Sequence, residues 1–202
     1  MISHAPDRPW PHPGAVLCGG RSRRMGVPKA GMLLPDGRSM LQQTRDILAT
    51  FCERVVLLGD PHGVPGHQCI DDLRADCGPL GAIEALLESG ISRQYLVVPC
   101  DLPLIQPGLL ARLLVGDEDG MTCFELPEDD RVGVLPCRIG AECLEEVRTL
   151  LDAGRRSVHA LVDTLGPDVR RVSLAPREAE LLMNVNTPEE FERACRHLSG
   201  PA

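Results

Sequence analysis

An α/β fold with a mostly parallel central sheet is predicted by three features of the chain. Short apolar runs that read as strands alternate with longer segments of helical period. These runs are almost continuously apolar, which is typical of parallel strands covered on both faces. The 202 residues also fit one hydrophobic core, because such cores keep growing to roughly 250 residues. We therefore expect a single-domain, Rossmann-like, three-layer α/β/α architecture.

The first half of the chain supplies the regular alternation of strands and helices. A loop rich in glycine and arginine follows the first strand, and the helix after it begins with a capping box. Ser39 and Gln42 form that box, since their side chains satisfy the free N–H groups of the first turn. The strands are expected at residues 15–18, 55–58 and 95–98, and the helices at residues 40–51 and 80–89.

The second half predicts three more helices and a pair of strands. The final helix has the clearest start, because Thr187-Pro188-Glu189-Glu190 combines an N-cap hydroxyl, a proline at the first helical position and a glutamate three residues after the cap. The strand pair is expected near residues 121–124 and 132–135, and the other two helices near residues 109–115 and 141–153.

Composition and charge narrow the class of protein. The net charge of −8 argues against a nucleic-acid surface or an anionic-membrane surface, since both need positive charge. Nine scattered cysteines without a C-x-x-C pair indicate a reducing compartment. Neither a signal peptide nor an apolar run of roughly 18 residues occurs. We expect a cytoplasmic protein with a short flexible leader at residues 1–13 and one domain at residues 14–198.

Residues 17–29 form the strongest candidate for a binding loop. The segment leaves the first strand and contains three glycines, three arginines and one lysine. Glycines let backbone N–H groups approach phosphate oxygens, and the cationic side chains balance the charge of a triphosphate. Neither the Walker pattern nor G-x-G-x-x-G occurs in it. Because ligands of open α/β sheets bind beyond the carboxyl ends of the strands, this loop predicts a phosphate site.

Five ordered motifs resemble those of the molybdenum cofactor guanylyltransferases. Residues 17–29 fit the family's opening L-x-G-G-x-x-x-R-M-G-x-x-K. The second motif is Asp72 followed by Cys77-Gly78-Pro79-Leu80-Gly81, which is similar to the family's D…G-P-L-x-G segment. The later motifs are C-D-x-P at residues 100–103, G-R-R-S at residues 154–157 and N-V-N-T-P-E-E at residues 184–190. The resemblance covers roughly residues 14–195 and implies a nucleotidyltransferase fold.

The resemblance implies Mg²⁺-dependent transfer of GMP from GTP to the phosphate of molybdopterin that carries molybdenum, with release of pyrophosphate. GTP and molybdopterin are then the small-molecule partners, and Mg²⁺ is the cofactor. Transient contact with a molybdoenzyme or its chaperone is also expected, whereas nucleic acid and membrane are not.

The resemblance also assigns roles to individual residues. Asp101 follows the apolar run at residues 95–98, so its carboxylate is expected at the carboxyl edge of the sheet, where Mg²⁺ would find hard oxygen ligands. The implied nucleotide-binding residues are Leu17, Gly19, Gly20, Arg21, Lys29, Asp72 and Gly78; the catalytic residues are Lys29, Arg24 and Asp101; the pterin-binding residues are Arg155, Arg156 and Asn184; and the metal ligands are Asp101 and Asn186.

Several of these residues also have purely structural explanations. A glycine that ends a helix, followed by exposed basic residues, accounts for Arg155 and Arg156 equally well. Gly78 and the residues after it fit an ordinary turn into a core helix. Helix capping explains Thr187 and part of the motif that contains Asn186. Cys100, although next to Asp101, is expected to be a small buried filler.

Two departures from the family pattern leave the base open. Leu58 stands where family members often carry asparagine at the end of the second strand, and Pro28 replaces the frequent aspartate before Lys29. A cytidylyltransferase using CTP is therefore an alternative, although the opening of those enzymes usually reads A-A-G. A non-catalytic nucleotide or pterin carrier is a second alternative, against which Lys29 and Asp101 argue. A sugar-phosphate nucleotidyltransferase, with P-K-x-x-x-L, is a third.

Overall fold

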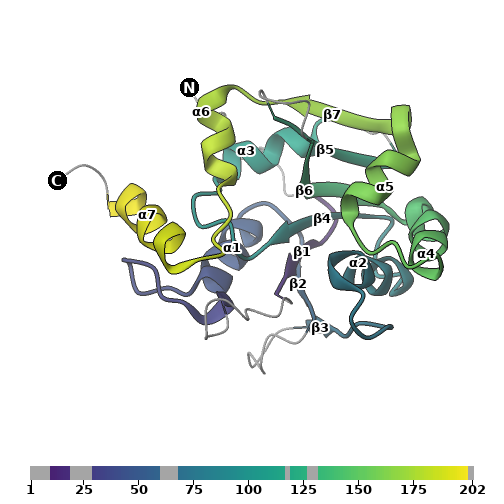
Figure 1. Ribbon diagram of the computed structural model, residues 1–202, viewed down its shortest axis with the longest axis horizontal. Coiled ribbons are helices and arrows are strands. Elements are labelled where there is room, and N and C mark those ends of the chain that lie inside the picture. The colour runs from purple at the N-terminus through teal and green to yellow at the C-terminus, as the bar shows by residue number, and fades with distance from the viewer. Residues whose placement is uncertain (1–9, 19–28, 60–67, 117–118, 127–131, 200–202) are drawn as a thin grey trace.

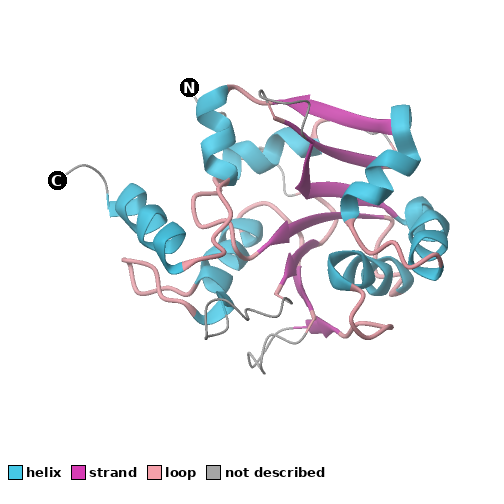
Figure 2. Cartoon of the chain, viewed as in Figure 1, coloured by secondary structure: helices cyan, strands magenta, loops and turns pink. Residues whose placement is uncertain are grey.

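The protein folds into three layers around a single twisted sheet, as a computed structural model shows (Figure 1). The structure describes residues 10–18, 29–59, 68–116, 119–126 and 132–199. Within these residues the sheet has seven strands in the order β3-β2-β1-β4-β6-β5-β7 (Figure 2). The strands are β1 Gly14–Leu17, β2 Val55–Leu58, β3 Gln68–Ile70, β4 Gln94–Pro99, β5 Met121–Glu125, β6 Val132–Gly140 and β7 Val169–Ser173.

The pairing of the strands confirms the prediction of a mostly parallel sheet. Strands β3, β2, β1 and β4 run parallel to one another, and β7 is parallel to β5. Only β6 runs antiparallel, to β4 on one side and to β5 on the other. The chain moves outward from β1 to β3 and then returns to the other side of β1 as β4. This reversal makes the carboxyl ends of β1 and β4 the switch point at which α/β sheets bind ligands.

Strand side chains alternate between two cores, one on each face of the sheet. Ala15 and Leu17 of β1 lie in the core covered by one helical layer, and Val16 lies in the core on the opposite face. The first layer contains α2 Gly78–Glu88, α4 Leu144–Asp152 and α5 Val158–Leu165, and the second contains α1 Met40–Ala49 and α3 Pro107–Ala111 (Figure 1). The predicted three-layer fold is therefore confirmed.

The C-terminal part of the chain packs beside the second layer. Helix α6 Pro176–Ala179 continues into the 3₁₀ helix Glu180–Leu182, whose leucines contact the core under α1 and α3. Helix α7 Pro188–Ser199 buries Ala194 against Leu34, Met40 and Leu104 in a third, smaller core. None of the helices in the described part of the chain is long and apolar enough to cross a membrane.

The predicted helix ends are confirmed by their hydrogen bonds. Ser39 Oγ accepts from the backbone N–H of Gln42 at 3.1 Å, and Gln42 Oε1 accepts from the N–H of Ser39 at 2.8 Å. The start of α7 has the same reciprocal pair: Thr187 Oγ1 accepts from the N–H of Glu190 at 3.2 Å, and Glu190 Oε2 accepts from the N–H of Thr187 at 3.0 Å. Gly154 ends α4 in the left-handed conformation, with a φ of 73°.

Four elements were not predicted from the sequence: β3, α5, α6 and β7. Strand β3 has only three residues and is mostly exposed, so it lacks an apolar run. Strand β7 reads V-R-R-V-S and lies at the edge of the sheet, where exposed polar side chains break the apolar pattern. The helix expected at residues 109–115 is α3 followed by the 3₁₀ helix Arg112–Leu114, and the one expected at residues 141–153 begins with the 3₁₀ helix Ala141–Cys143 before α4.

Part of the predicted leader makes contacts with the domain. The backbone N–H of Trp10 donates to Phe51 at 2.6 Å, and Leu96 N–H donates to the carbonyl of Pro13 at 3.1 Å. His12 Nδ1 lies 2.8 Å from Ser92 Oγ. Residues 10–13 are thus attached to β4 and to the end of α1, ahead of the boundary predicted at residue 14, whereas residues 1–9 lie outside the described part of the chain.

Candidate active site

The carboxyl ends of β1 and β4 lie side by side at the switch point. Leu17 pairs in register with Pro99, and the N–H of Cys100 donates to the carbonyl of Leu17 at 3.1 Å. Leu17 itself is buried. The chain after β1 and the segment that contains Asp101 therefore leave the sheet at the same place. Within the loop that follows β1, the predicted Gly19, Gly20, Arg21 and Arg24 lie outside the described residues.

One backbone hydrogen bond joins two of the predicted motifs. The N–H of Val185 donates to the carbonyl of Asp101 at 2.9 Å. Val185 is fully buried, whereas its neighbours Asn184 and Asn186 are exposed. The buried valine thus anchors the segment and keeps both asparagines at the surface beside Asp101. The structure therefore brings the two predicted metal ligands, Asp101 and Asn186, to one end of β4.

Lys29 and Asp72 both follow strands that end at this edge of the sheet. Lys29 begins the 3₁₀ helix Lys29–Gly31 that follows the glycine and arginine loop. Asp72 follows β3, which is separated from β1 by β2, and is exposed. Strand spacing in a sheet puts β3 about 10 Å from β1. Because β3 is parallel to β2, β1 and β4, the carboxyl ends of these strands share one edge, and Asp72 lies at the same edge as Asp101.

Gly78 and Arg156 bring the remaining motifs into contact. Gly78 is the first residue of α2 and has a φ of 60°, a conformation that glycine adopts readily. A Cβ at Gly78 would lie 3.6 Å from the carbonyl oxygen of Arg156. Arg156 Nη1 in turn donates to the carbonyl of Asp76 at 3.0 Å. Arg155 and Arg156 are both exposed, directly after the glycine that ends α4.

The two thiols next to the switch point are packing residues. Cys100 is buried in the core under α1 and α3, which confirms its prediction as a small filler. Burial raises the pKa of Cys18 to about 12, and its Sγ lies 3.4 Å from the carbonyl of Val16. Cys18 therefore stays protonated at neutral pH and is not activated as a nucleophile.

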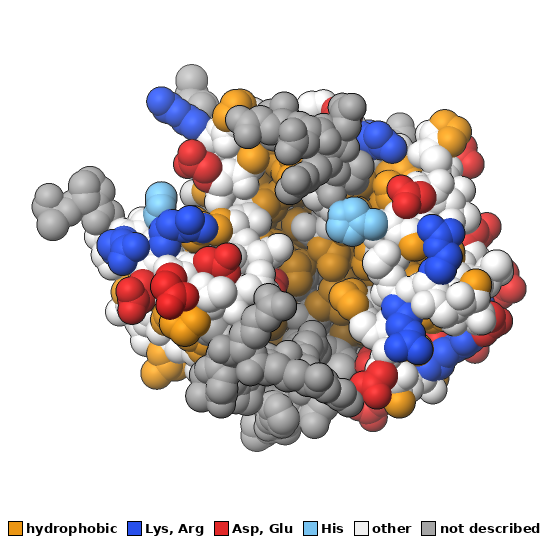
Figure 3. All heavy atoms as spheres, viewed as in Figure 1, with side chains coloured by type: hydrophobic (Ala, Val, Ile, Leu, Met, Phe, Trp, Pro, Cys, Tyr) orange, Lys and Arg blue, Asp and Glu red, His pale blue; other side chains and the backbone are white. Residues whose placement is uncertain are grey.

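The surface over this region is hollowed. Figure 3 shows hydrophobic side chains along the floor of a hollow in the middle of the viewed face, between the two helical layers. Charged side chains gather to either side, over α7 and over α2 and α4. An apolar floor with charged rims suits a ligand that combines ring systems with phosphate groups.

Comparison with known proteins identifies the fold and the family. A family model described as the MobA-like NTP transferase domain matches residues 14–169. The chain belongs to this family. The motif resemblance to guanylyltransferases is thereby confirmed, and the protein is an enzyme of the nucleotidyltransferase class.

Relatives of similar length support the assignment to the MobA-like family. The molybdenum cofactor guanylyltransferase of Xanthomonas euvesicatoria pv. vesicatoria is 35% identical, over 93% of this chain and 95% of its own. The probable molybdenum cofactor guanylyltransferase of Pelotomaculum thermopropionicum is 39% identical, over 90% of both. The structure of molybdopterin-guanine dinucleotide biosynthesis protein A from Archaeoglobus fulgidus matches with a TM-score of 0.77 and 21% identity, covering 94% of this chain and 100% of that one, and shows the common fold.

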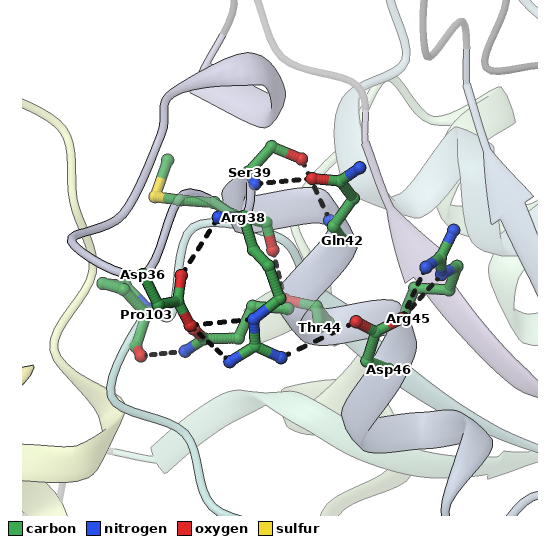
Figure 4. Close-up of polar contacts among 10 residues, drawn as sticks. Asp36, Arg38, Ser39, Gln42, Thr44, Arg45, Asp46 and Pro103 are labelled. Carbon is green, nitrogen blue, oxygen red and sulfur yellow. Dashed lines mark hydrogen bonds and ion pairs between the residues drawn. The ribbon is translucent and has the colours of Figure 1, made fainter.

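One residue that supports the site of this MobA-like enzyme was missed from the sequence. Gln43 is buried on α1, and its side-chain amide donates to the carbonyl of Pro103, two residues after Asp101. Figure 4 shows this bond beside the Asp36–Arg38 ion pair of the preceding turn. The sequence feature that could have indicated this role was a glutamine on the apolar face of a predicted helix. Gln43 helps fix the loop that carries the predicted metal ligand.

A pocket of about 410 Å³ adjoins Gln43 on the side of α1 and α7. Its lining residues are Leu34, Pro35, Asp36, Arg38, Gln43, Ile47 and Leu198. None of the residues predicted for nucleotide, pterin or metal binding lines it. The pocket is therefore distinct from the switch point.

We expect Asp72 to make folding stability depend on pH. Although Asp72 as a whole residue is exposed, desolvation of its carboxyl group and, next, the charge of Asp71 raise the pKa of that group in the folded protein. The stability that this shift contributes is full below the pKa of the unfolded chain and is lost as the pH rises through the folded-state pKa. Asp72→Asn, which cannot ionise, should unfold at higher urea concentration than the parent above that pH.

The measurement is urea unfolding of the parent and the variant across the acidic range. Asp71→Asn is the matched control, since it leaves Asp72 ionisable and removes only the neighbouring charge, and it should show an intermediate pH dependence. Identical pH dependence in the parent and Asp72→Asn would contradict the expectation.

Proposed function

We propose that this MobA-like enzyme transfers GMP from GTP to the phosphate of molybdopterin that carries molybdenum, in a Mg²⁺-dependent reaction in the cytoplasm that releases pyrophosphate. The observation that carries the proposal is the hydrogen bond from Val185 to Asp101, because it unites two separated motifs at the switch point. The names of the relatives from Xanthomonas and Pelotomaculum support the same activity.

The donor groups at this point suit magnesium. Asp101 offers a carboxylate and Asn186 an amide oxygen, and both are hard oxygen donors. The described residues contain no cluster of three or more His, Cys, Asp and Glu side chains that could hold a metal. Such a sparse donor set fits Mg²⁺, which takes one or two carboxylates and completes its octahedron with water and substrate phosphates. Bound there, the ion would polarise the α-phosphate.

The nucleotide side of the proposed site neutralises charge and aligns the triphosphate. Lys29 and the arginines Arg21 and Arg24 would balance the β- and γ-phosphates and the pyrophosphate that leaves. Backbone N–H groups at Gly19 and Gly20 would donate hydrogen bonds to oxygens of the same phosphates. Asp72 would accept a hydrogen bond from the ribose or base, and the start of α2 at Gly78 would offer further N–H groups.

The acceptor side holds the phosphorylated pterin. Arg155, Arg156 and Asn184 would bind its phosphate and ring, and guanidinium groups suit this because they donate in pairs. Although Arg156 already donates to Asp76, a guanidinium has five N–H groups, so donors remain for a phosphate.

The reaction is a single displacement at phosphorus. An oxygen of the molybdopterin phosphate attacks the α-phosphorus of GTP, a new P–O bond forms, and the bond to the bridging oxygen breaks as pyrophosphate leaves. A phosphate monoester is already anionic at neutral pH, so the protein needs to supply alignment and charge neutralisation.

Product identification tests the proposal. The protein is incubated with molybdopterin, Mg²⁺ and a mixture of GTP, CTP and ATP, and the products are analysed by mass spectrometry, with calorimetry of each nucleotide in parallel. We expect a GMP adduct and an equivalent of pyrophosphate. A CMP adduct would instead establish a cytidylyltransferase, and nucleotide binding without pyrophosphate release would establish a carrier. Delivery of the product to a molybdoenzyme or its chaperone stays a prediction.

A further inference from the structure

The loop between β3 and α2 is held in a costly conformation. It spans residues 71–77 and carries Asp72 of the proposed nucleotide side. Asp76, within it, has a φ of 57°, which is uncommon for a residue other than glycine. Such a conformation persists only where the surrounding structure fixes it. The contacts that fix this loop therefore bear on where Asp72 and the start of α2 lie.

Arg74 is the central residue of those contacts. Its guanidinium pairs with Glu84 Oε1 at 2.9 Å and with Asp152 Oδ1 at 2.5 Å. Glu84 belongs to α2, and its side chain is only 3% exposed. Asp152 is the last residue of α4, three residues before Arg155. One side chain thus connects the nucleotide-side loop to α2 and to the helix that ends at the acceptor-side turn, residues 153–157.

A second contact returns from the acceptor-side turn to the loop. Arg156 Nη1 donates to the carbonyl of Asp76, the residue with the positive φ. The backbone of Arg156 also lies against Gly78. The loop and the turn are consequently joined at two points, once through Arg74 and once through Arg156.

We propose that Arg74 is a positioning residue that holds the nucleotide-side loop and the acceptor-side turn in one relative geometry. The inference rests on the proposed function, which assigns these two segments to the two substrates. A displacement at phosphorus needs the attacking oxygen and the leaving group in line, and a misplacement of about 1 Å costs about 10²-fold in rate. A single residue that spans both segments maintains that alignment without touching either substrate.

Arg148 provides a matched control. It also joins α2 and α4, through an ion pair with Glu88 of α2, and it makes a second ion pair with Glu145 within α4. Its side chain is 35% exposed, the same as that of Arg74. Helices α2 and α4 lie side by side (Figure 1), and Glu88 is the last residue of α2, at the opposite end of the helix from the loop at residues 71–77. Arg148→Gln therefore removes a link between the same helices but leaves the loop and the turn joined.

Steady-state kinetics test the inference through the pyrophosphate released from GTP and molybdopterin. Arg74→Gln is expected to lower kcat by about 10- to 100-fold with a change in the KM for GTP of less than about threefold. The kcat of Arg74→Lys should lie between those of the parent and Arg74→Gln, because an ammonium group cannot pair with two carboxylates as the planar guanidinium group does. Equal losses in Arg74→Gln and Arg148→Gln would overturn the proposal, since they would show a purely structural role.

Asp152→Asn keeps the proposal testable if Arg74→Gln does not fold, because Glu84 is buried and would lose its partner. Asp152 is exposed, so its substitution cuts only the link to the acceptor-side turn and leaves the Arg74–Glu84 pair intact. We expect a lower kcat with an unchanged unfolding temperature. An unchanged kcat would contradict the proposal.

Hydrogen–deuterium exchange separates this inference from the proposed function, because it needs no turnover. Without substrate, Arg74→Gln should exchange faster than the parent at both residues 71–77 and residues 153–157, and Arg148→Gln at neither. If the parent enzyme released no pyrophosphate, the proposed function would be refuted. The exchange rates would still show whether Arg74 connects residues 71–77 to residues 153–157. Unchanged exchange at residues 153–157 in Arg74→Gln would refute the link itself.

Discussion

Asp101→Ala is expected to lower kcat by about 10³-fold or more while the fold stays intact. The carboxylate is the one negatively charged oxygen donor among the proposed metal ligands, so its removal should prevent productive binding of Mg²⁺. The described contact that joins this position to Val185 uses the backbone carbonyl of Asp101, which the substitution retains. Turnover is measured as pyrophosphate release, and folding as the unfolding temperature.

The control for Asp101→Ala must remove a carboxylate elsewhere on the surface. Asp168 is exposed in the 3₁₀ helix Gly166–Asp168 before β7, so Asp168→Asn should retain full turnover. Calorimetry adds a second readout, because Mg²⁺ should strengthen GTP binding in the parent but not in Asp101→Ala. Undiminished turnover in Asp101→Ala would refute the assignment of this residue.

The parts of the fold predicted from sequence are those with strong local signals. Strands β1, β2 and β4 are buried on both faces, so their side chains are almost all apolar and the pattern is plain. Helices α1 and α7 begin with capping boxes, whose chemistry is complete within four residues. By contrast, β7 is an edge strand with two arginines, and its pairing with β5 depends on the tertiary fold.

The same distinction applies to the candidate site. The positions of Asp101 and Gly78 followed from the ends of a strand and the start of a helix, both of which are local features. Gln43 and Arg74 carry no such local signal, because Pro103 is 60 residues from Gln43 and Asp152 is 78 residues from Arg74 in sequence. Their roles depend on which helix packs beside which loop. Glu84, which lies between apolar residues in the middle of α2, was a sequence feature that could have indicated a buried ion pair.

Gly81→Ala is expected to destabilise the protein, although alanine is normally the better helix former. A Cβ at Gly81 would lie 2.5 Å from the Cβ of Cys77, so the backbone at the start of α2 must shift. Overpacking of this kind costs about 1–3 kcal/mol. The gain in helix propensity is about 1 kcal/mol, so it offsets only part of that cost. Each net kcal/mol should lower the unfolding temperature by about 2–4 °C.

Gly31→Ala is the matched control, because a Cβ built at Gly31 would meet no atom within 4 Å among the described residues beyond its own chain neighbours and local backbone. That substitution should change stability by less than about 1 kcal/mol and in the stabilising direction, since alanine reduces the freedom of the unfolded chain. Thermal unfolding of both variants would therefore give shifts of opposite sign. Equal shifts would show that the packing at Cys77 does not determine the result.

A double variant identifies the atom responsible for the loss. Cys77→Gly removes the Cβ that Gly81→Ala would meet, and by itself it should destabilise the protein because Cys77 is buried. If the clash is the cause, Cys77→Gly with Gly81→Ala should lose less stability than the sum of the two single losses. The double variant should also recover affinity for GTP relative to Gly81→Ala, because Cys77 is joined directly to Gly78 at the proposed nucleotide side. Strict additivity would place the cost of Gly81→Ala elsewhere in α2.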